Sequence, residues 1–310
     1  MKKLLEIAAS PLQEIFPNRC KTKDVQLFIK RDDLLHSVVS GNKWRKLCYN
    51  LSAAKEQGKT TLLTFGGAYS NHIHAVAAAG QLLGFKTIGL IRGEEPPSYG
   101  ATLAFVKSRG MQLHFLSRSN YRNKEIPIRI DLSDCYLLPE GGTNDLAING
   151  CEDIVNELLL QIGNLSRIYY CVSCGTGGTI AGMINGLKGK GTVIGFSALK
   201  GNFMDEEIKN LQNRYQLPAY SNWSVNGDYH FGGYAKYKPE LVNFMKEFYE
   251  ETSIALDPVY TGKMAFGILD LIAKDHFPKG SKIIMIHTGG LQGIAGFNER
   301  FEENLPVEHN

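Results

Sequence analysis

The sequence lacks any long apolar segment and any strong excess of charge of one sign. No apolar run approaches the ~20 residues that span a bilayer, and the net charge of +3 is small for 310 residues. We therefore expect neither a membrane nor a nucleic-acid partner. The N-terminal part also lacks the pattern of a secretory signal, because its short apolar run is interrupted by Ser10-Pro11. These absences favour a cytoplasmic protein.

Cysteine is scarce, with six residues in the chain, which favours free thiols in a reducing compartment over a disulfide framework. Only Cys171 and Cys174 have C-x-x-C spacing, so a redox or metal role has to be considered. Cys171 lies inside an apolar run, and no second C-x-x-C or spaced histidine pair completes a zinc site. We predict Cys171 in the core, Cys174 in a loop, and no metal.

The signatures of two common enzyme classes are missing as well. A dinucleotide-binding loop beginning at Gly175 would need glycine at position 180, which is isoleucine, and an acid near Leu199, where none occurs. No G-x-S-x-G segment accompanies Asp257 and His287, so a hydrolase with a serine triad is disfavoured. The loop from Gly175 fits a single phosphate group better than a dinucleotide.

Strand-like and helix-like segments alternate along the chain, which predicts an α/β architecture with mainly parallel, helix-covered sheets. The expected strands are 27–30, 60–65, 87–91, 112–116, 136–138, 168–172, 192–197 and 282–287. The expected helices include 44–57, 71–83, 101–108, 145–160, 178–188 and 260–274. Residues 117–124 and 218–238 are expected to be loops, and the second either covers a site or is an irregular connection.

Several of the expected strands end directly in glycine. This is true at Gly66-Gly67, Gly141-Gly142, Gly175 and Gly289-Gly290. In open α/β sheets, ligands bind beyond the carboxyl ends of the strands. We therefore expect these glycine-containing ends to meet at one crevice.

Lys43 follows one strand in a setting that sets it apart from an ordinary lysine. A lone lysine is usually a solvated surface charge, but here Gly41 permits a tight turn and Trp44 with Leu47 indicates the start of a helix with an apolar face. The positive end of that helix would lower the pKa of Lys43 and favour its free amine.

Two other segments offer sites for anions. Ser70 or Asn71 is expected to cap a helix of small residues, which is either ordinary capping or a place to hold a carboxylate or phenolate oxygen. The loop from Gly175 to Thr179 opens another helix, and its backbone N–H groups form a nest of phosphate size. A lysine together with a separate phosphate site is what a protein needs to hold pyridoxal phosphate as a Schiff base. A non-catalytic phosphate- or nucleotide-binding module is the alternative.

The pattern resembles the fold-type-II pyridoxal-phosphate enzymes, and in particular the group of 1-aminocyclopropane-1-carboxylate (ACC) deaminases and D-cysteine desulfhydrases. The similarity extends in order from residues 28–33, through 40–47 and 70–72, to 287–290. It implies a fold like that of the tryptophan synthase β subunit, with two three-layer domains of open, twisted, mainly parallel sheets. Residues 1–47 with 151–310 would form the large domain and 48–150 the small inserted one. It also implies a homodimer.

The resemblance assigns roles to individual residues. Lys43 would be the Schiff-base lysine and catalytic base, Asn71 would contact the phenolic oxygen of the cofactor, and Ser70 the substrate carboxylate or a transferred proton. Tyr234 and Tyr260 would act on the substrate, with His72 also on the substrate side. The phosphate would be held by Cys174, Gly175, Thr176, Gly177, Gly178 and Thr179.

Thr261 would lie beside the pyridine nitrogen, and the residue type there separates two reactions. A carboxylate at this place protonates the nitrogen and makes the ring a strong electron sink. ACC deaminases of the group typically have glutamate, which suits opening a ring that has no α-proton. The desulfhydrases have threonine, and a hydroxyl suffices when an α-proton is removed and hydrosulfide leaves. The sequence thus favours a D-cysteine desulfhydrase acting on a small amino acid, with ACC deaminase as the alternative.

Overall fold

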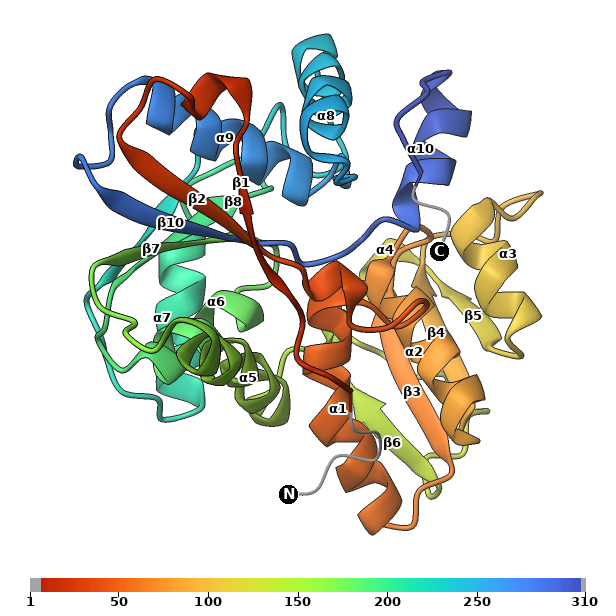
Figure 1. The fold of residues 1–310 in the computed structure, drawn as a ribbon. Helices are drawn as coiled ribbons and strands as arrows, with labels where there is room; N and C mark the ends of the chain where they lie inside the picture. The colour runs from red at the N-terminus through yellow and green to blue at the C-terminus, as the bar shows by residue number, and fades with distance from the viewer. Residues whose placement is uncertain (1–6, 308–310) are drawn as a thin grey trace.

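Residues 7–307 are described by the computed structural model, in which two β-sheets are covered by helices (Figure 1). The first sheet has the strand order β1-β2-β10-β7-β8-β9. Its strands are β1 (Leu12–Ile15), β2 (Val25–Lys30), β7 (Ile168–Cys174), β8 (Thr192–Ser197), β9 (Trp223–Asn226) and β10 (Ser281–Ile286). Only β1 runs antiparallel to its neighbour.

The second sheet has four parallel strands in the order β5-β4-β3-β6. They are β3 (Thr61–Gly66), β4 (Lys86–Arg92), β5 (Gln112–Leu116) and β6 (Cys135–Leu138). The helices are α1 (Gly41–Glu56), α2 (Asn71–Leu83), α3 (Ala101–Ser108), α4 (Arg118–Arg122), α5 (Asp145–Ile162), α6 (Gly178–Leu187), α7 (Met204–Arg214), α8 (Pro239–Thr252), α9 (Thr261–Ala273) and α10 (Gly293–Phe301). Short 3-10 turns occupy Asn18–Cys20, Asp32–Leu34 and Glu140–Gly142.

Side chains from both faces of each sheet are buried. Since successive residues of a strand point to opposite sides, neighbouring residues join different hydrophobic cores. In β7, Cys171 joins the core formed with α8 and α9, whereas Tyr170 and Val172 join the core formed with α6 and α7. In β3, Leu62 packs toward α1 and α2, and Leu63 packs toward Tyr121 of α4. The predicted α/β architecture with mainly parallel, helix-covered sheets is therefore confirmed.

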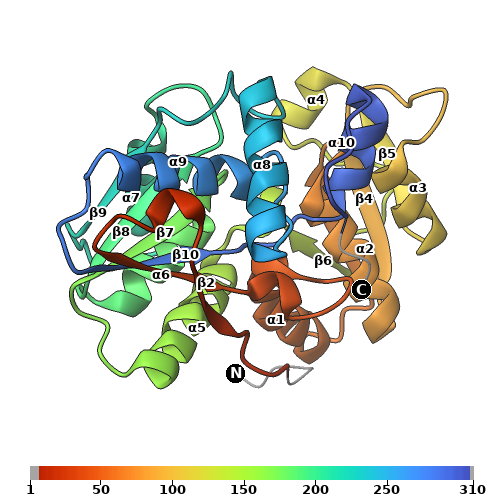
Figure 2. The ribbon, with the colours of Figure 1, turned by 45° about the horizontal axis from the view of Figure 1, so that its top comes forward.

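Helix α1 lies between the two sheets (Figures 1 and 2), and a buried group of charges fixes it there. Arg45, only 2% exposed, forms ion pairs with Asp32 at 2.8 Å and Glu157 of α5 at 2.5 Å. Lys30 at the end of β2 pairs with the same Glu157 at 2.7 Å. Since an unpaired buried charge is costly, this network sets the position of the segment that carries Lys43.

Several predictions about local structure were wrong. Residues 118–122 of the expected loop 117–124 form α4, and the expected loop 218–238 contains β9. Cys174 is the last residue of β7 and is buried, so it does not belong to the loop. None of the six cysteines forms a disulfide. No helix within residues 7–307 combines the length and apolarity of a bilayer span.

The boundaries of the two domains stay a prediction. All four strands of the second sheet fall within 48–150, as expected. Helix α1 crosses the boundary at residue 47, however, and α5 crosses the one at residue 150. Near the C-terminus, α10 lies beside α3, which follows β4 of the smaller sheet (Figures 1 and 2).

Candidate active site

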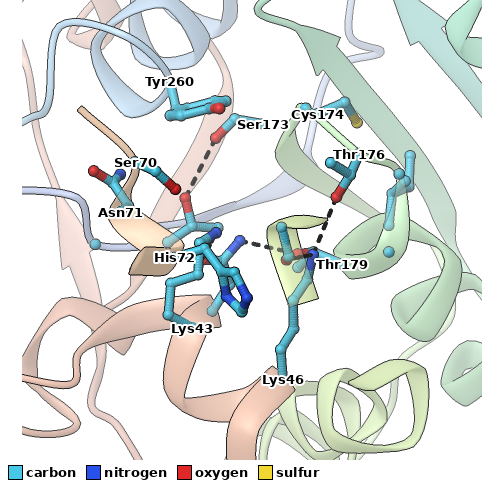
Figure 3. Close-up of a pocket in the computed structure, with 18 of the residues that line it drawn as sticks. Lys43, Lys46, Ser70, Asn71, His72, Ser173, Cys174, Thr176, Thr179 and Tyr260 are labelled. Atoms are coloured by element: carbon cyan, nitrogen blue, oxygen red, sulfur yellow. Dashed lines mark hydrogen bonds between the residues drawn. The ribbon is translucent and has the colours of Figure 1, made fainter. Parts of the chain in front are cut away.

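A cavity with about 670 Å³ of free space, including its mouth, lies where the strand ends of the two sheets meet (Figure 3). Gly141, Gly175 and Gly289 line it, each just beyond the end of a different strand. The expected convergence of the glycine-containing strand ends is thus confirmed for three of the four, whereas Gly66-Gly67 does not line the cavity. The cavity brings together these predicted site residues: Lys43, Ser70, Asn71, His72, Cys174, Gly175, Thr176, Gly177, Gly178, Thr179, Tyr234 and Tyr260.

Gly41 allows α1 to begin against the end of β10. Its φ of +64° is in the left-handed region, and a Cβ atom there would lie 2.0 Å from the carbonyl oxygen of Thr288. The next amide, that of Asn42, donates to the same oxygen at 3.2 Å. Only glycine allows this approach of two backbones, and it places Lys43 at the cavity wall.

The amine of Lys43 is suited to act as a nucleophile near neutral pH. Burial lowers the pKa of Lys43 from 10.5 to about 7, and the charge of Lys46 acts in the same direction. The direction agrees with the prediction from the sequence, and burial is the main cause. The Nζ atom donates to Asn42 Oδ1 at 3.1 Å, and Asn42 Nδ2 donates to Thr179 at 3.0 Å. At pH 7 about half of such an amine is neutral, and the neutral form can condense with an aldehyde.

The N-terminus of α6 has the features of a phosphate site. Its N-cap is Gly177 with φ +73°, and no side chain caps the first turn, which leaves its amide groups available to an anion. A Cβ at Gly178 would lie 2.7 Å from Thr143 Oγ1, and one at Gly175 would lie 3.1 Å from the ring of Tyr260. The backbone at these two glycines therefore packs closely against the side chains of Thr143 and Tyr260.

Lys46 is a site residue that the sequence analysis missed. It is 2% exposed, and its Nζ donates to Gly141 O at 3.1 Å, Thr143 Oγ1 at 3.0 Å and Thr176 Oγ1 at 3.3 Å. Within the described residues it forms no ion pair, and burial lowers its pKa. A phosphate in the adjacent nest would supply the missing counter-charge. The spacing of three from Lys43, which places both lysines on one helix face, could have identified it.

On the other side of the cavity, Ser70 and Asn71 begin α2 (Figure 3). Ser70 is the N-cap, as expected, and its Oγ accepts from the amide of Ile73 at 3.3 Å. Asn71 reaches toward Gly290, where a Cβ would lie 2.9 Å from Asn71 Nδ2. The polar groups of this helix start face the cavity opposite the phosphate-sized nest, as Figure 3 shows.

His72 is neutral and oriented by Thr64. The Thr64 hydroxyl donates its one proton to Leu138 O at 2.9 Å. Its oxygen therefore accepts a hydrogen bond from the N–H at His72 Nε2, also at 2.9 Å. The Nδ1 atom is then an acceptor, and among the described residues it has no partner. Burial, with the charges of Lys43 and Lys46, holds the pKa of His72 well below its ordinary value.

Tyr234 and Tyr260 form a pair at the cavity mouth, with their ring centroids 6.2 Å apart. Burial raises the pKa of both phenols, for Tyr260 well above its ordinary value. Both therefore remain protonated and can donate hydrogen bonds. Lys263 holds the segment before Tyr234, since its buried Nζ donates to His230 O at 2.9 Å and to Gly233 O at 2.7 Å.

Thr261 is the one predicted site residue that the structure does not place at this cavity. It is 0% exposed, and its hydroxyl is engaged with Asp257: it accepts from the Asp257 amide at 2.8 Å and donates to Asp257 Oδ1 at 2.9 Å. Its role beside a pyridine nitrogen stays a prediction. Thr288, at the end of β10, does line the cavity.

Comparison with known proteins points to one family. The family model described as pyridoxal-phosphate dependent enzyme matches residues 4–289. A mitochondrial bifunctional D-cysteine desulfhydrase/ACC deaminase of Arabidopsis thaliana is 33% identical, with 87% of this chain and 73% of that protein covered. A Pyrococcus abyssi protein provisionally named an ACC deaminase is 31% identical, with coverages of 96% and 93%. A crystal structure of an ACC deaminase homologue superposes with a TM-score of 0.82 at 27% identity, covering 96% and 94%.

Proposed function

We propose, given that this chain belongs to the family of pyridoxal-phosphate-dependent enzymes, that it catalyses α,β-elimination on a small amino acid, with D-cysteine as substrate. The fold-type-II architecture and the cofactor predicted from the sequence are confirmed by the family and by the related structure. In the proposed reaction, D-cysteine and water give pyruvate, ammonia and hydrogen sulfide. The observation that carries the proposal is the half-buried Lys43, with a pKa of about 7, between a phosphate nest and a polar helix start.

The residues present fit the cofactor. The uncapped first turn of α6 and the uncompensated cation of Lys46 match a phosphate dianion. When bound, pyridoxal phosphate supplies an aldehyde that condenses with amines and a ring that accepts electrons from the substrate carbon. Burial lowers the pKa of Lys43 to about 7, so about half of its amine is neutral near pH 7, and we assign it as the covalent anchor and as the base that takes the α-proton.

The remaining polar groups bind and orient the substrate. The start of α2, with Ser70 and Asn71, offers hydroxyl, amide and helix-terminal N–H groups to a carboxylate. The protonated phenols of Tyr234 and Tyr260 can donate to the departing sulfur or hold a proton close to it. The buried Nδ1 of His72 has no hydrogen-bond partner among the described residues, so it can accept one from an ordered water, and a direct contact with the substrate stays a prediction.

The choice of D-cysteine over ACC depends on the charged groups around the cavity. Among the described residues, those that line it include no aspartate or glutamate. The buried carboxylate of Asp257, in the segment before Tyr260, accepts from the amides of Val259, Tyr260 and Thr261 and from the Thr261 hydroxyl. Four hydrogen bonds stabilise its negative charge locally. The site thus favours a reaction with a removable α-proton and a good leaving group.

ACC deaminase is the second candidate, and the names of the relatives favour it equally. A panel of purified holoenzyme with D-cysteine, L-cysteine and ACC distinguishes the two, with pyruvate and sulfide measured for the cysteines and 2-oxobutanoate for ACC. We expect turnover of D-cysteine, abolished in Lys43→Ala but retained in Lys55→Ala, a change at an exposed position of the same helix. Turnover of ACC without either cysteine would overturn the choice of substrate.

We also propose, from the resemblance to its group, that the enzyme is a homodimer that binds a small amino acid and, from its few free cysteines, that it is cytoplasmic. Light scattering of the purified protein measures the oligomeric state directly. A monomeric mass across the micromolar range would contradict the dimer.

A further inference from the structure

A second chamber adjoins the active-site cavity. It holds about 780 Å³ of free space, including its mouth, and shares three wall residues with the first cavity: Asn71, Tyr234 and Tyr260. These are residues assigned above to the carboxylate side and the leaving-group side of the substrate. A substituent on the substrate that extends past the two tyrosines therefore enters this chamber.

The chamber lies between α10, the start of α3 and the segment that precedes α9; α10 and α3 are side by side in Figures 1 and 2. Apolar side chains form much of its wall, among them Val259, Phe297 and Phe301. The two phenylalanine rings pack against each other with centroids 4.9 Å apart, and Tyr237 packs on both at 4.9 and 4.8 Å. The wall is thus a packed aromatic cluster.

The cationic side chains of the chamber lie at its exposed side. Arg300, at the exposed side, lies over the ring of Tyr69 with 5.7 Å between the guanidinium carbon and the ring centroid. Lys236 is likewise exposed. Asp257 is the one carboxylate among the described lining residues, and its oxygens already accept four hydrogen bonds. The interior therefore favours an apolar occupant.

The thiol of cysteine is too small to fill such a space. We propose that the chamber binds an apolar group carried on the sulfur, so that the enzyme cleaves S-alkyl and S-aryl conjugates of cysteine. This inference rests on the proposed elimination and names its wider substrate class. The apolar group gains free energy in proportion to the area it buries, which lowers KM relative to free cysteine.

The chemistry is the same elimination with a different leaving group. The α-proton passes to Lys43, the Cβ–S bond breaks, and its electron pair leaves with sulfur as a thiolate. Water then hydrolyses the aminoacrylate product to pyruvate and ammonia. One S-substituted cysteine and one water thus give one thiol, one pyruvate and one ammonia, without an oxidant or reductant.

Gly296 offers a way to fill the chamber without touching the catalytic residues. It lies inside α10 and lines the chamber, and a Cβ there meets only the Cβ of Ala101, at 3.9 Å. Its φ is not in the left-handed region, so a side chain is tolerated. Ala295, its neighbour in α10, is exposed and does not line the chamber. Gly296→Leu and Ala295→Leu are thus a matched test and control.

The experiment measures kcat/KM for both enantiomers of cysteine and of S-benzylcysteine, with pyruvate and benzyl mercaptan as products. We expect native holoenzyme to release these in equal amounts. Gly296→Leu should lower kcat/KM for S-benzylcysteine about ten-fold or more, in the range of steric discrimination in apolar pockets. Cysteine turnover should stay within about two-fold, and Ala295→Leu should change neither.

A binding measurement separates this inference from the proposed function. Benzyl mercaptan, which cannot undergo elimination, should bind native holoenzyme in calorimetry, and Gly296→Leu should weaken that binding about ten-fold, whereas Ala295→Leu should not. Absence of binding, or equal binding by all three proteins, overturns the role of the chamber even if cysteine is turned over. Turnover of cysteine but not of S-benzylcysteine also overturns it. Gly296-dependent binding without any amino-acid turnover supports the chamber and refutes the proposed function.

Discussion

Replacing Lys46 with methionine should affect the apo-protein and the holoenzyme in opposite directions. The lysine is buried, its three acceptors are neutral oxygens, and burial lowers its pKa from 10.5. A lysine whose pKa is lower in the folded than in the unfolded state destabilises the fold at every pH below the unfolded value, most strongly below the folded one. Methionine has a similar length and no charge, so Lys46→Met should leave the apo-protein as stable or make it more stable.

Cofactor binding should instead be weakened. Hydrogen bonds to charged groups contribute about 1.5–3 kcal/mol, which corresponds to an increase of about 10- to 150-fold in the Kd for pyridoxal phosphate. Titration of the apo-protein, followed by absorbance or equilibrium dialysis, gives this Kd. Thermal unfolding with and without cofactor gives the stabilities of the two forms.

Lys55→Met is the matched control, since Lys55 is an exposed lysine of the same helix. It should change neither the Kd nor the apo stability by more than a small amount. If Lys46→Met binds pyridoxal phosphate as tightly as the native protein, Lys46 does not face the phosphate and the assignment of the nest is wrong. A marked loss of apo stability would show that its three hydrogen bonds outweigh the cost of the buried charge.

Three further results are expected. The rate of covalent uptake of pyridoxal phosphate by the apo-protein should rise with pH, with a midpoint at about 7, because the neutral amine of Lys43 reacts and its pKa is about 7. Stopped-flow absorbance measures this rate, and a midpoint near 10 would contradict the prediction. Gly41→Ala should lower the free energy of unfolding, measured in urea, by several times the ~1 kcal/mol expected for Gly58→Ala. Both glycines have positive φ, but only at Gly41 would a Cβ atom lie 2.0 Å from backbone; equal losses for the two variants would refute this. Arg45→Met should cost about 3–5 kcal/mol by leaving the buried carboxylate of Asp32 without its cationic partner, and urea unfolding showing less than ~1 kcal/mol would contradict it.

Much of the fold could be predicted from local signals in the sequence. The strands 112–116 and 192–197 and the helices 71–83 and 101–108 have the predicted bounds, because glycine or a capping residue marks their ends. Apart from Cys174, the wrong predictions concern short polar segments. Strand β9 has four residues at the edge of its sheet, and α4 has five largely polar residues. Such elements form through their tertiary neighbours, such as Tyr121 packed under β3 and β4, and local propensity does not reveal them.

The features of the site likewise fall into those that local motifs predicted and those that only the structure shows. Glycine motifs located the nest, the helix start of α2 and the turn before Lys43, because the backbone geometry there leaves few residue choices. What the sequence could not show is which side chains meet across long separations, as Asn42 and Thr179 do. It also could not show that Asp257 engages the Thr261 hydroxyl or that burial is the main cause of the lowered pKa of Lys43. The contact of Asn42 with Thr179 and the burial of Lys43 depend on tertiary packing between segments that are distant in the sequence.

The attachment point of the cofactor is the most direct measurement. The holoenzyme is reduced with borohydride and digested, and the peptide that carries the phosphopyridoxyl group is sequenced by mass spectrometry. Lys43 and Lys46 both line the cavity, so the measurement has to distinguish residues one helical turn apart. The group should be found on Lys43 alone; its presence on Lys46 or on any other lysine would contradict the account.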